Sequence, residues 1–484
     1  SGLPFFDIVG LPDTAVKESR ERVRAAIKNS GLEFPVKRIT VNLAPADTKK
    51  EGPAYDLAIA VAILLATEQI PDHPLARSIF LGELSLDGSI RPIHGVLPAL
   101  LSVKEQARSV VLSCGNAAEA SHVKEIDVYT VNTLNELVSM FKNEICPAPY
   151  KKAHTDINHT VPNIIEDFSD VKGQEGAKRA LEIAAAGGHN AIMIGPPGSG
   201  KTMLARRLPS ILPELTYEES LEITKIYSAA GLLDASEGLI SLRPFRSPHH
   251  TISTAALVGG GRIPQPGEIS LAHHGVLFLD ELPEFRRDVL EALRQPLEDG
   301  VVTISRSNGT AVFPASFTLI GSANPCPCGF FGDNTRECLC TPMQINRYLG
   351  KISGPLMDRF DIQIEVPAIP FEDLSTNRTS ENSASIRSRV NTARRVQTER
   401  YKNDGIFYNS QLNSKLIDKY CHINAHQKKM MRNAFVSLNL SARAYGRILK
   451  VARTIADLEG TEKIQDHHLA EAIQYRRLDR QFWV

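Results

Sequence analysis

The sequence predicts an α/β protein whose largest domain is built on a parallel sheet. Three apolar runs have the length and composition of buried strands: Ala191–Gly195, Gly275–Asp280 and Phe317–Ser322. Helical patterns separate these runs, and such alternation is typical of a doubly wound parallel sheet with helices on both faces. A glycine-rich segment joins the first run to a helical pattern at Met203–Leu208.

The 484 residues are too many for one hydrophobic core, so we expect several domains. A first α/β domain is predicted for 1–145, with helices at Ala15–Asn29 and Ala54–Ala66 and strands at Arg38–Leu43, Ser78–Gly82 and Val110–Ser113. We then expect a polar, proline-bearing linker at 146–166, the sheet domain at 167–370 and a helical C-terminal domain at 371–484.

The charge of the chain is balanced, with 55 Lys and Arg against 55 Asp and Glu. Contact with a nucleic acid would therefore need local basic patches. No apolar run reaches the roughly eighteen residues of a membrane-spanning helix, so we expect no membrane contact. The chain begins Ser-Gly-Leu-Pro, without an initiator Met or a signal-like segment. We expect a cytoplasmic protein whose native N-terminus is missing.

The glycine-rich segment has the spacing of a phosphate-binding loop. Gly195 and Gly200 bracket four residues ahead of Lys201 and Thr202. Backbone N–H groups of such a loop turn toward phosphates, and the following helix adds its positive N-terminus. The Lys reaches the β- and γ-phosphates, and the Thr hydroxyl is a ligand for Mg²⁺. The residues predicted to contact the nucleotide here are Gly195, Pro196, Pro197, Gly198, Ser199, Gly200, Lys201, Thr202 and Met203.

Polar residues follow the two later strands. Asp280 and Glu281 end the second strand, where an Asp would hold Mg²⁺ and a Glu would orient or deprotonate the attacking water. Asn324 ends the third strand and is a third candidate residue for this site. The alternative is a turn, because Asn before Pro is common in turns. Arg359 suits an arginine finger, although an Arg next to an Asp is most often a surface ion pair. Arg443 opens an amphipathic helix predicted at 445–458, from where it can reach phosphate.

Four of the seven cysteines form two close pairs that resemble a metal site. Four thiolates satisfy a tetrahedral structural zinc site and leave no open position for catalysis. The C-x-C spacing is tighter than the usual C-x-x-C, so free reduced thiols in a loop are the alternative. The predicted zinc ligands are Cys326, Cys328, Cys338 and Cys340, and the remaining Cys114, Cys146 and Cys421 are scattered and interpreted as packing residues.

The order of these parts resembles the AAA+ ATPases, and more narrowly the magnesium-chelatase-like group and its ComM (YifB) family. The resemblance covers essentially the full length. Its specific motifs are the segments Val171–Gln174, Phe245–Thr251, Pro266–Gly275 and Asn324–Gly329.

This resemblance implies an ATPase core with bound ATP and Mg²⁺, a C-terminal helical lid and a hexameric ring. It assigns Asn324 to sensor 1, Arg359 to the arginine finger and Arg443 to sensor 2, with Arg447 or Arg453 as alternatives for the last role. It also implies that Val171 and Gln174, ahead of the loop, contribute to nucleotide binding.

Two insertions fit the same resemblance. Residues 243–267 match the helix-2 insert, and 301–313 form a predicted β-hairpin that turns at Asn-Gly, where the family has its presensor hairpin. In such hexamers both elements face the central pore, which implies contact with a DNA backbone; the alternative is that they hold subunits together. The residues proposed for DNA contact are Arg243, Arg246, His249, His250, Arg262 and Arg306.

The N-terminal domain resembles the proteolytic domain of Lon, through the segments 50–57 and 88–97. The Lon pattern has a nucleophilic Ser and a Lys base, but these positions hold Ala54 and Leu97. We therefore expect a catalytically inactive domain for binding or assembly.

The resemblance thus implies an ATP-dependent hexameric DNA motor, a helicase that drives branch migration during natural transformation. Its partners would be single- and double-stranded or branched DNA and further copies of itself. A chelatase-like motor that remodels a partner protein is the alternative. An ATP-dependent protease is opposed by Ala54 and Leu97.

Overall fold

The computed structural model describes residues 5–142, 148–151, 166–234, 238–261, 264–306, 309–333, 336–369 and 380–478. The chain divides into two compact units, the first comprising Ser1–Asn158 with Ser220–Ser241 and the second His159–Glu219 with Leu242–Val484. Ser220–Ser241 thus clusters with the N-terminal residues, although it falls in the range predicted for the sheet domain. Most of the predicted linker 146–166 lies outside the described residues. Within those residues, no helix is long and apolar enough to cross a membrane.

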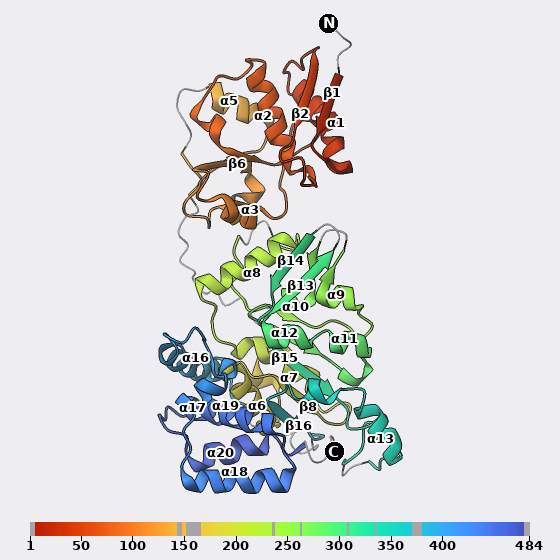
Figure 1. The fold of residues 1–484 in the computed structure, drawn as a ribbon, viewed down its shortest axis with the longest axis vertical. Coiled ribbons are helices and arrows are strands. Elements are labelled where there is room, and N and C mark those ends of the chain that lie inside the picture. The colour runs from red at the N-terminus through yellow and green to blue at the C-terminus, as the bar shows by residue number, and fades with distance from the viewer. Residues whose placement is uncertain are drawn as a thin grey trace. The chain divides into compact units, whose positions relative to one another are not determined.

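The N-terminal unit is an α/β structure with three small sheets (Figure 1). Strands β1 and β2 pair in parallel, β3, β6 and β7 form a parallel sheet, and β4 and β5 are antiparallel. Its strands are β1 Phe5–Val9, β2 Arg38–Asn42, β3 Ile79–Leu81, β4 Glu83–Leu84, β5 Ile90–Arg91, β6 Ser109–Ser113 and β7 Asp127–Val131, and its helices are α1 Thr14–Asn29, α2 Asp56–Ala66, α3 Val96–Val103, α4 Ala117–Ala120 and α5 Leu134–Lys142.

Local sequence explains why the two longest helices of this unit pack together. Asp13 caps α1 by accepting the N–H of Val16 at 2.7 Å. The apolar helix α2 is buried at most positions, and its Asp56 carboxylate is fully buried too. Arg22 of α1 neutralises this carboxylate through two hydrogen bonds of 2.6 and 3.1 Å. A buried ion pair therefore joins α1 and α2, which correspond to the first and second predicted helices.

The second unit is built on a five-stranded parallel sheet with the order β16-β8-β15-β12-β9. This confirms the predicted parallel sheet, and the three predicted strands correspond to β8, β12 and β15. The strands are β8 Ala191–Ile194, β9 Phe245–Arg246, β12 Val276–Leu279, β15 Thr318–Ala323 and β16 Ile362–Glu365.

Successive residues of β8 and β12 contribute to two separate cores, one on each face of the sheet. In β8, Ala191 and Met193 join the core that includes the C-terminal helices, whereas Ile192 and Ile194 join the core on the opposite face. These two strands are consequently apolar at every position, as expected for strands covered on both sides.

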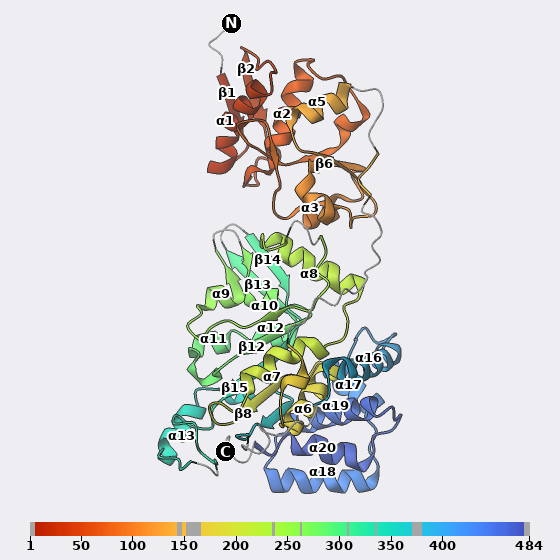
Figure 2. The ribbon, with the colours of Figure 1, turned by 180° about the vertical axis from the view of Figure 1, so that it is seen from behind.

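Helices surround this sheet, and a helical C-terminal region packs on one of its two cores (Figures 1 and 2). The helices of this unit before the C-terminal region are α6 Glu175–Gly187, α7 Lys201–Arg207, α9 Thr254–Val258, α10 Glu268–Leu271, α11 Arg287–Glu291, α12 Arg294–Asp299, α13 Pro342–Leu349 and α14 Gly354–Met357, and the residues of α8 Tyr217–Ala229 are divided between the two units. The C-terminal helices are α16 Ser383–Arg400, α17 Ser414–Tyr420, α18 Ala425–Leu438, α19 Ala442–Leu458 and α20 Asp466–Gln474.

Two antiparallel hairpins lie beside each other. Strands β13 Val301–Arg306 and β14 Gly309–Pro314 form the predicted hairpin, and β10 Gly259–Gly260 pairs with β11 Gln265–Pro266. A Cβ atom on Gly259 would lie 2.8 Å from the Ile304 side chain, which shows how closely they approach. The segment 243–267, expected to be one insert, gives its first residues to the central sheet, because β9 pairs with β12.

Candidate active site

The phosphate-binding loop follows β8 and ends where α7 begins at Lys201. Glycine is required at several positions. A Cβ atom on Gly195 would lie 2.0 Å from the carbonyl oxygen of Val366. Gly198 and Gly200 have φ angles of 77° and 92°, which favour glycine. These glycines let the backbone turn tightly between β8 and α7, as a phosphate-binding loop requires.

Lys201 lies buried at the base of this loop, with 8% of its surface exposed. Its ammonium group donates to the carbonyl oxygens of Gly195 and Pro196 at 2.7 and 2.8 Å and to Asn324 Oδ1 at 3.3 Å. Burial lowers the pKa of Lys201 to about 8, against the attraction of Asp280 and of a second acid nearby. The loop, the lysine and the predicted sensor residue therefore meet at one point.

The predicted magnesium ligands are also brought together. Thr202 Oγ1 donates to Asp280 Oδ2 at 2.8 Å. A hydroxyl and a carboxylate are oxygen ligands of the kind that Mg²⁺ prefers, so this pair fits the ion. The hydroxyl of Ser322 donates to the other oxygen of Asp280 and accepts the N–H of Glu281 at 3.0 Å. Ser322 thereby fixes the orientation of both predicted acidic residues.

Glu281 has an unusual backbone for a non-glycine residue, with φ of 53° in the left-handed region. Its side chain is exposed, unlike the buried strand before it. The pKa of the Tyr348 hydroxyl is raised by burial and by the carboxylates of Glu284 and Glu281. Tyr348 of α13 therefore lies near the predicted catalytic acid.

The segment ahead of α6 closes the other side of the loop. Gln174, also left-handed with φ of 58°, donates from Nε2 to the carbonyl oxygens of Pro367 and Ser199 at 2.7 and 3.3 Å. Val171 is buried in the adjacent core. Met203 lies on α7 with 37% of its surface exposed.

Arg359 lies at the opposite end of the sheet from this loop. It precedes β16, and its carbonyl oxygen accepts from Asn190, the residue before β8, at 3.0 Å. The four residues of β8 separate Asn190 from the loop, a rise of about 13 Å. Arg359 forms an ion pair with Glu298 of α12. Its buried Nε has no hydrogen-bond partner within the described part of the chain.

Arg443 also lies at this amino end of the sheet. It pairs with Asp358 at 3.1 Å and is largely exposed. Arg447 is nearly buried and lies 3.7 Å from Asp358, while Arg453 is bonded to Asp457 at 3.1 Å. The structure therefore does not bring Arg359 or Arg443 to the loop of the same chain. Among the alternatives for the sensor 2 role, Arg453 is held in internal contacts.

The basic residues proposed for DNA contact fall into two groups. Arg243 is only 13% exposed; it donates to the carbonyl oxygens of Pro213 and His274 at 2.6 and 2.7 Å and pairs with Glu219 at 2.7 Å. These internal contacts argue against its predicted role in binding DNA. Arg246 forms two hydrogen bonds of 2.6 and 2.7 Å to Glu268, which neutralises its charge.

The other proposed contacts are more accessible. The rings of His249 and His250 lie 4.0 Å apart, and His249 is exposed. Arg306 is exposed on β13, beside Gly260 of the neighbouring hairpin. Arg262 lies outside the described residues.

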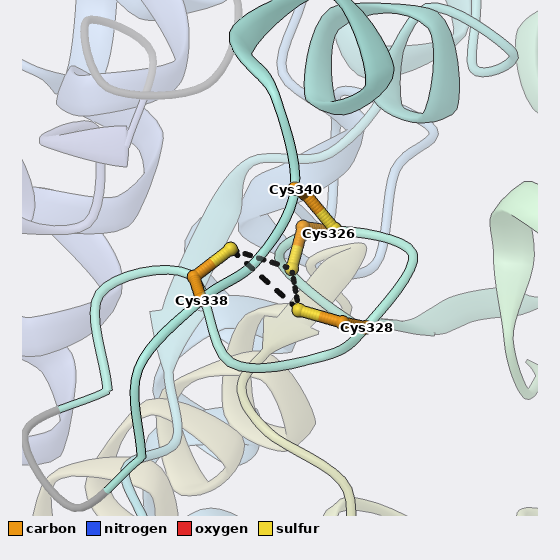
Figure 3. Close-up of side chains that lie close together, drawn as sticks. All are labelled: Cys326, Cys328, Cys338 and Cys340. Atoms are coloured by element: carbon orange, nitrogen blue, oxygen red, sulfur yellow. Dashed lines mark hydrogen bonds between the residues drawn. The ribbon is translucent and has the colours of Figure 1, made fainter.

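The four clustered cysteines converge in space (Figure 3). The Sγ of Cys326 lies 3.3 Å from that of Cys328 and 3.7 Å from that of Cys338, and the last two are 3.6 Å apart. With Cys340, all four sulfur atoms lie within 4.8 Å of one another. This donor set suits a thiophilic metal.

Comparison with known proteins agrees with this geometry. Residues 167–374 match the family model described as magnesium chelatase, subunit ChlI, residues 1–116 match that of subunit ChlI of Mg-chelatase, and residues 380–476 match that of the ChlI C-terminal part. The competence protein ComM of Haemophilus influenzae is 46% identical over 484 residues, covering 99% of this chain and 93% of that protein. The chain belongs to the ComM/YifB family.

Other relatives differ in how much of the chain they match. The protein YifB of Escherichia coli is 44% identical over 483 residues, covering 99% of this chain and 93% of its own length. The magnesium-chelatase 67 kDa subunit of Chlorobaculum parvum is 32% identical over 162 residues, or 33% of this chain and 23% of that protein. The sheet domain of this ComM/YifB family member is thus an AAA-type ATPase domain of the magnesium-chelatase ChlI kind.

Sequence reasoning did not give a role to Ser322. Its role depends on strand register, because Gly321 pairs with Leu279 in the parallel sheet, which places Ser322 beside Asp280. The contact between Gly329 and Pro197 was missed as well. A Cβ atom on Gly329 would lie 2.6 Å from Pro197 Cδ, so the cysteine-bearing segment lies directly against the phosphate-binding loop.

Proposed function

We propose that this protein is an ATP-driven motor on DNA, a hexameric helicase that drives branch migration during natural transformation. The observation that carries the proposal is the 46% identity, over 99% of the chain, to a protein named for competence. In this proposal, the residues described above bind ATP, and hydrolysis of that ATP drives the motor. The DNA substrate and the hexamer are part of the proposal.

The geometry supports ATP hydrolysis in the following way. Lys201 and the loop N–H groups hold the β- and γ-phosphates, and Asn324 contacts Lys201 from the neighbouring strand. Thr202 and Asp280 would hold Mg²⁺, which neutralises phosphate charge when bound. Glu281 accepts a proton from the attacking water, while Ser322 fixes the backbone from which it extends.

The arginines at the amino end of the sheet support a ring. Arg359 and Arg443 lie about one strand length from the loop of their own chain, and in the proposed ring each serves the nucleotide of a neighbouring subunit. In this proposal, Arg359 neutralises charge on the transferred phosphoryl group. Arg443, held beside it through Asp358, acts on the same nucleotide.

The paired hairpins are the proposed DNA contact. Arg306 and His249 are exposed, and Arg306 lies beside the β10 strand. In a six-membered ring each positive charge appears six times, which would strengthen attraction to a phosphate backbone without any excess of basic residues in the chain. Arg243 has no part in this contact.

The N-terminal unit is proposed to be a Lon-like domain without peptidase activity. Leu97 is fully buried, and its N–H donates to Glu119 at 2.8 Å. Neither Leu97 nor Ala54 carries the hydroxyl or amine that a Ser-Lys peptidase needs. We propose that this domain binds a partner or assists assembly.

A chelatase-like motor that remodels a partner protein is the second candidate. The magnesium-chelatase family models that match the chain favour it. The named chelatase subunit, however, covers only 33% of this chain, whereas the competence protein covers 99%. Because the match to the competence protein covers nearly the whole chain, it favours the DNA motor.

A strand-displacement assay on labelled three-way and four-way DNA junctions tests the proposal. We expect the wild-type protein to separate the strands only with ATP, and Glu281→Gln to bind the junction without separating it. Arg306→Ala should weaken junction binding while leaving the basal ATP turnover intact. The matched control is Arg206→Ala, an exposed arginine on α7. Absence of ATP-dependent strand displacement by the wild type would refute the DNA motor.

A further inference from the structure

The spacing of the cysteine sulfur atoms fits one tetrahedral ion. Zn–S bonds of about 2.3 Å at tetrahedral angles place neighbouring sulfur atoms about 3.8 Å apart. The three sulfur–sulfur separations among Cys326, Cys328 and Cys338 are 3.3, 3.6 and 3.7 Å. A disulfide would need about 2.0 Å. An iron–sulfur cluster lies between its thiolates and would hold them farther apart. One mononuclear site is the arrangement that fits.

Backbone N–H groups support thiolates at this position. Gly329 and Phe331 both donate to the Sγ of Cys326, at 3.2 and 3.3 Å. Cys326 is fully buried, so its sulfur depends on these donors rather than on water. The φ of 88° at Gly329 shapes the tight turn that points both N–H groups at the sulfur. Donors to a ligand atom are typical of the surroundings of metal sites.

The segment that carries the cysteines has little apolar core of its own. Cys326 packs with Ile345, Tyr348 and Leu349 of α13 in a small cluster that the other three cysteines border. The large apolar residues Leu339 and Met343 point outward, with 86% and 78% of their surfaces exposed. A segment with so small a core is of the kind that a structural metal stabilises.

This segment touches the ATPase site in three places. Cys326 follows two residues after Asn324, which contacts Lys201. Gly329 lies against Pro197 of the phosphate-binding loop. Tyr348, which packs on Cys326, is close enough to Glu284 and Glu281 for their carboxylates to add to the effect of burial on its pKa. The cysteine-bearing segment therefore adjoins Asn324, the phosphate-binding loop and the surroundings of Glu281.

We propose that Cys326, Cys328, Cys338 and Cys340 bind one structural Zn²⁺, and that this ion positions Asn324 and the phosphate-binding loop for ATP hydrolysis. Binding replaces the protons of the thiols with the ion, and these protons pass to solvent. No electron transfer is involved. Four protein ligands leave the zinc no open position, so it positions the site and does not react. The proposal rests on the ATPase site alone, so failure of DNA strand displacement leaves it intact.

The test uses the full chain, purified without chelator, and measures zinc per chain together with ATP turnover and the affinity for a non-hydrolysable ATP analogue. We expect one zinc per chain in the wild type and none in Cys328→Ser. Turnover should fall at least about tenfold in Cys328→Ser, because small displacements of positioning groups cost up to about a hundredfold, while the analogue still binds. The controls Cys114→Ser and Leu339→Ala, an exposed thiol and an exposed loop residue, should keep both zinc and turnover.

A second measurement covers the case in which Cys328→Ser does not fold. A zinc-selective chelator, applied to the folded wild type and followed by assay in excess Mg²⁺, should remove the zinc and the turnover together, and added Zn²⁺ should restore both. Wild-type protein without zinc would refute the metal site. Zinc removal that leaves turnover unchanged would refute the link to the ATPase site.

Discussion

The two ends of the central sheet differ in whether their polar groups find partners in the chain. At the carboxyl end, Lys201, Thr202 and Asp280 are all hydrogen-bonded to neighbours. At the amino end, Arg359 Nε and Arg447 Nη1 are buried without a hydrogen-bond partner in the described part of the chain. Buried donors without acceptors cost about 1–3 kcal/mol each. The polar groups of the first end satisfy one another, whereas the second end keeps two buried donors that are unpaired among the described residues and, in the proposed ring, is the end that meets a neighbouring subunit.

The largest expected effect on ATP turnover comes from a change at the amino end of the sheet. Arg359→Ala should reduce ATP turnover by about 10³-fold, the lower range for removal of an arginine finger, while ATP still binds. If Arg359 serves a neighbouring nucleotide, mixing Arg359→Ala chains with Lys201→Ala chains should restore part of the turnover. Some sites in the mixture then combine an intact loop with an intact arginine.

The mixing result decides the comparison. Turnover that stays at the level of the two separate variants would mean that each site is completed within one chain. The distinction between the two ends of the sheet would then be wrong.

The next effect is at the carboxyl end of the sheet. Lys201→Ala should lower turnover by about 10²–10³-fold, the range seen when one donor to a transition-state oxygen is removed. ATP affinity should fall as well, because the same ammonium faces the phosphates in the ground state. The control is Arg206→Ala, which removes an exposed charge from the same helix. An equal loss of turnover in Arg206→Ala would contradict this prediction. It would show that the total charge of α7 matters and that the position of Lys201 does not.

A smaller effect concerns pH. The pKa of Lys201 is about 8 instead of 10.5, because the ammonium is buried. Phosphates favour the charged form, so ATP binding should take up a proton above pH 8, and affinity should fall by up to about tenfold per pH unit there. Below pH 8 the lysine is already charged, and affinity should be flat. Calorimetry in buffers of different ionisation enthalpy measures the uptake, and Lys201→Arg, charged throughout, should show none.

Sequence patterns predicted the parts of the site that depend on local spacing. The loop at 195–202 and the acidic pair after β12 need only a strand, a turn and a helix in succession. Predictions for Arg243 and Arg443 depended on which surface each side chain meets, and tertiary contacts with Glu219 and Asp358 decide that. Single-sequence patterns carry no information about such long-range pairs.

The same limit applies to the contacts that link segments far apart in sequence. The close approach of Gly329 to Pro197 follows from the packing of β15 beside β8. The edge strand β9 has only two residues, too few for a recognisable apolar pattern. The hairpin at 301–314 was predictable because its turn chemistry is local.

The left-handed backbone of Glu281 gives the site a cost in stability. A side chain in this region costs roughly 1–2 kcal/mol, of which glycine would recover part after its own entropy loss of about 0.5–1 kcal/mol. Glu281→Gly should therefore melt at a higher temperature than Glu281→Gln, by up to about 1 kcal/mol in the free energy of unfolding, although both lack the acid. The fold would thus be more stable without the residue that the proposed chemistry needs. Stability and activity therefore make opposite demands on the backbone of this one residue.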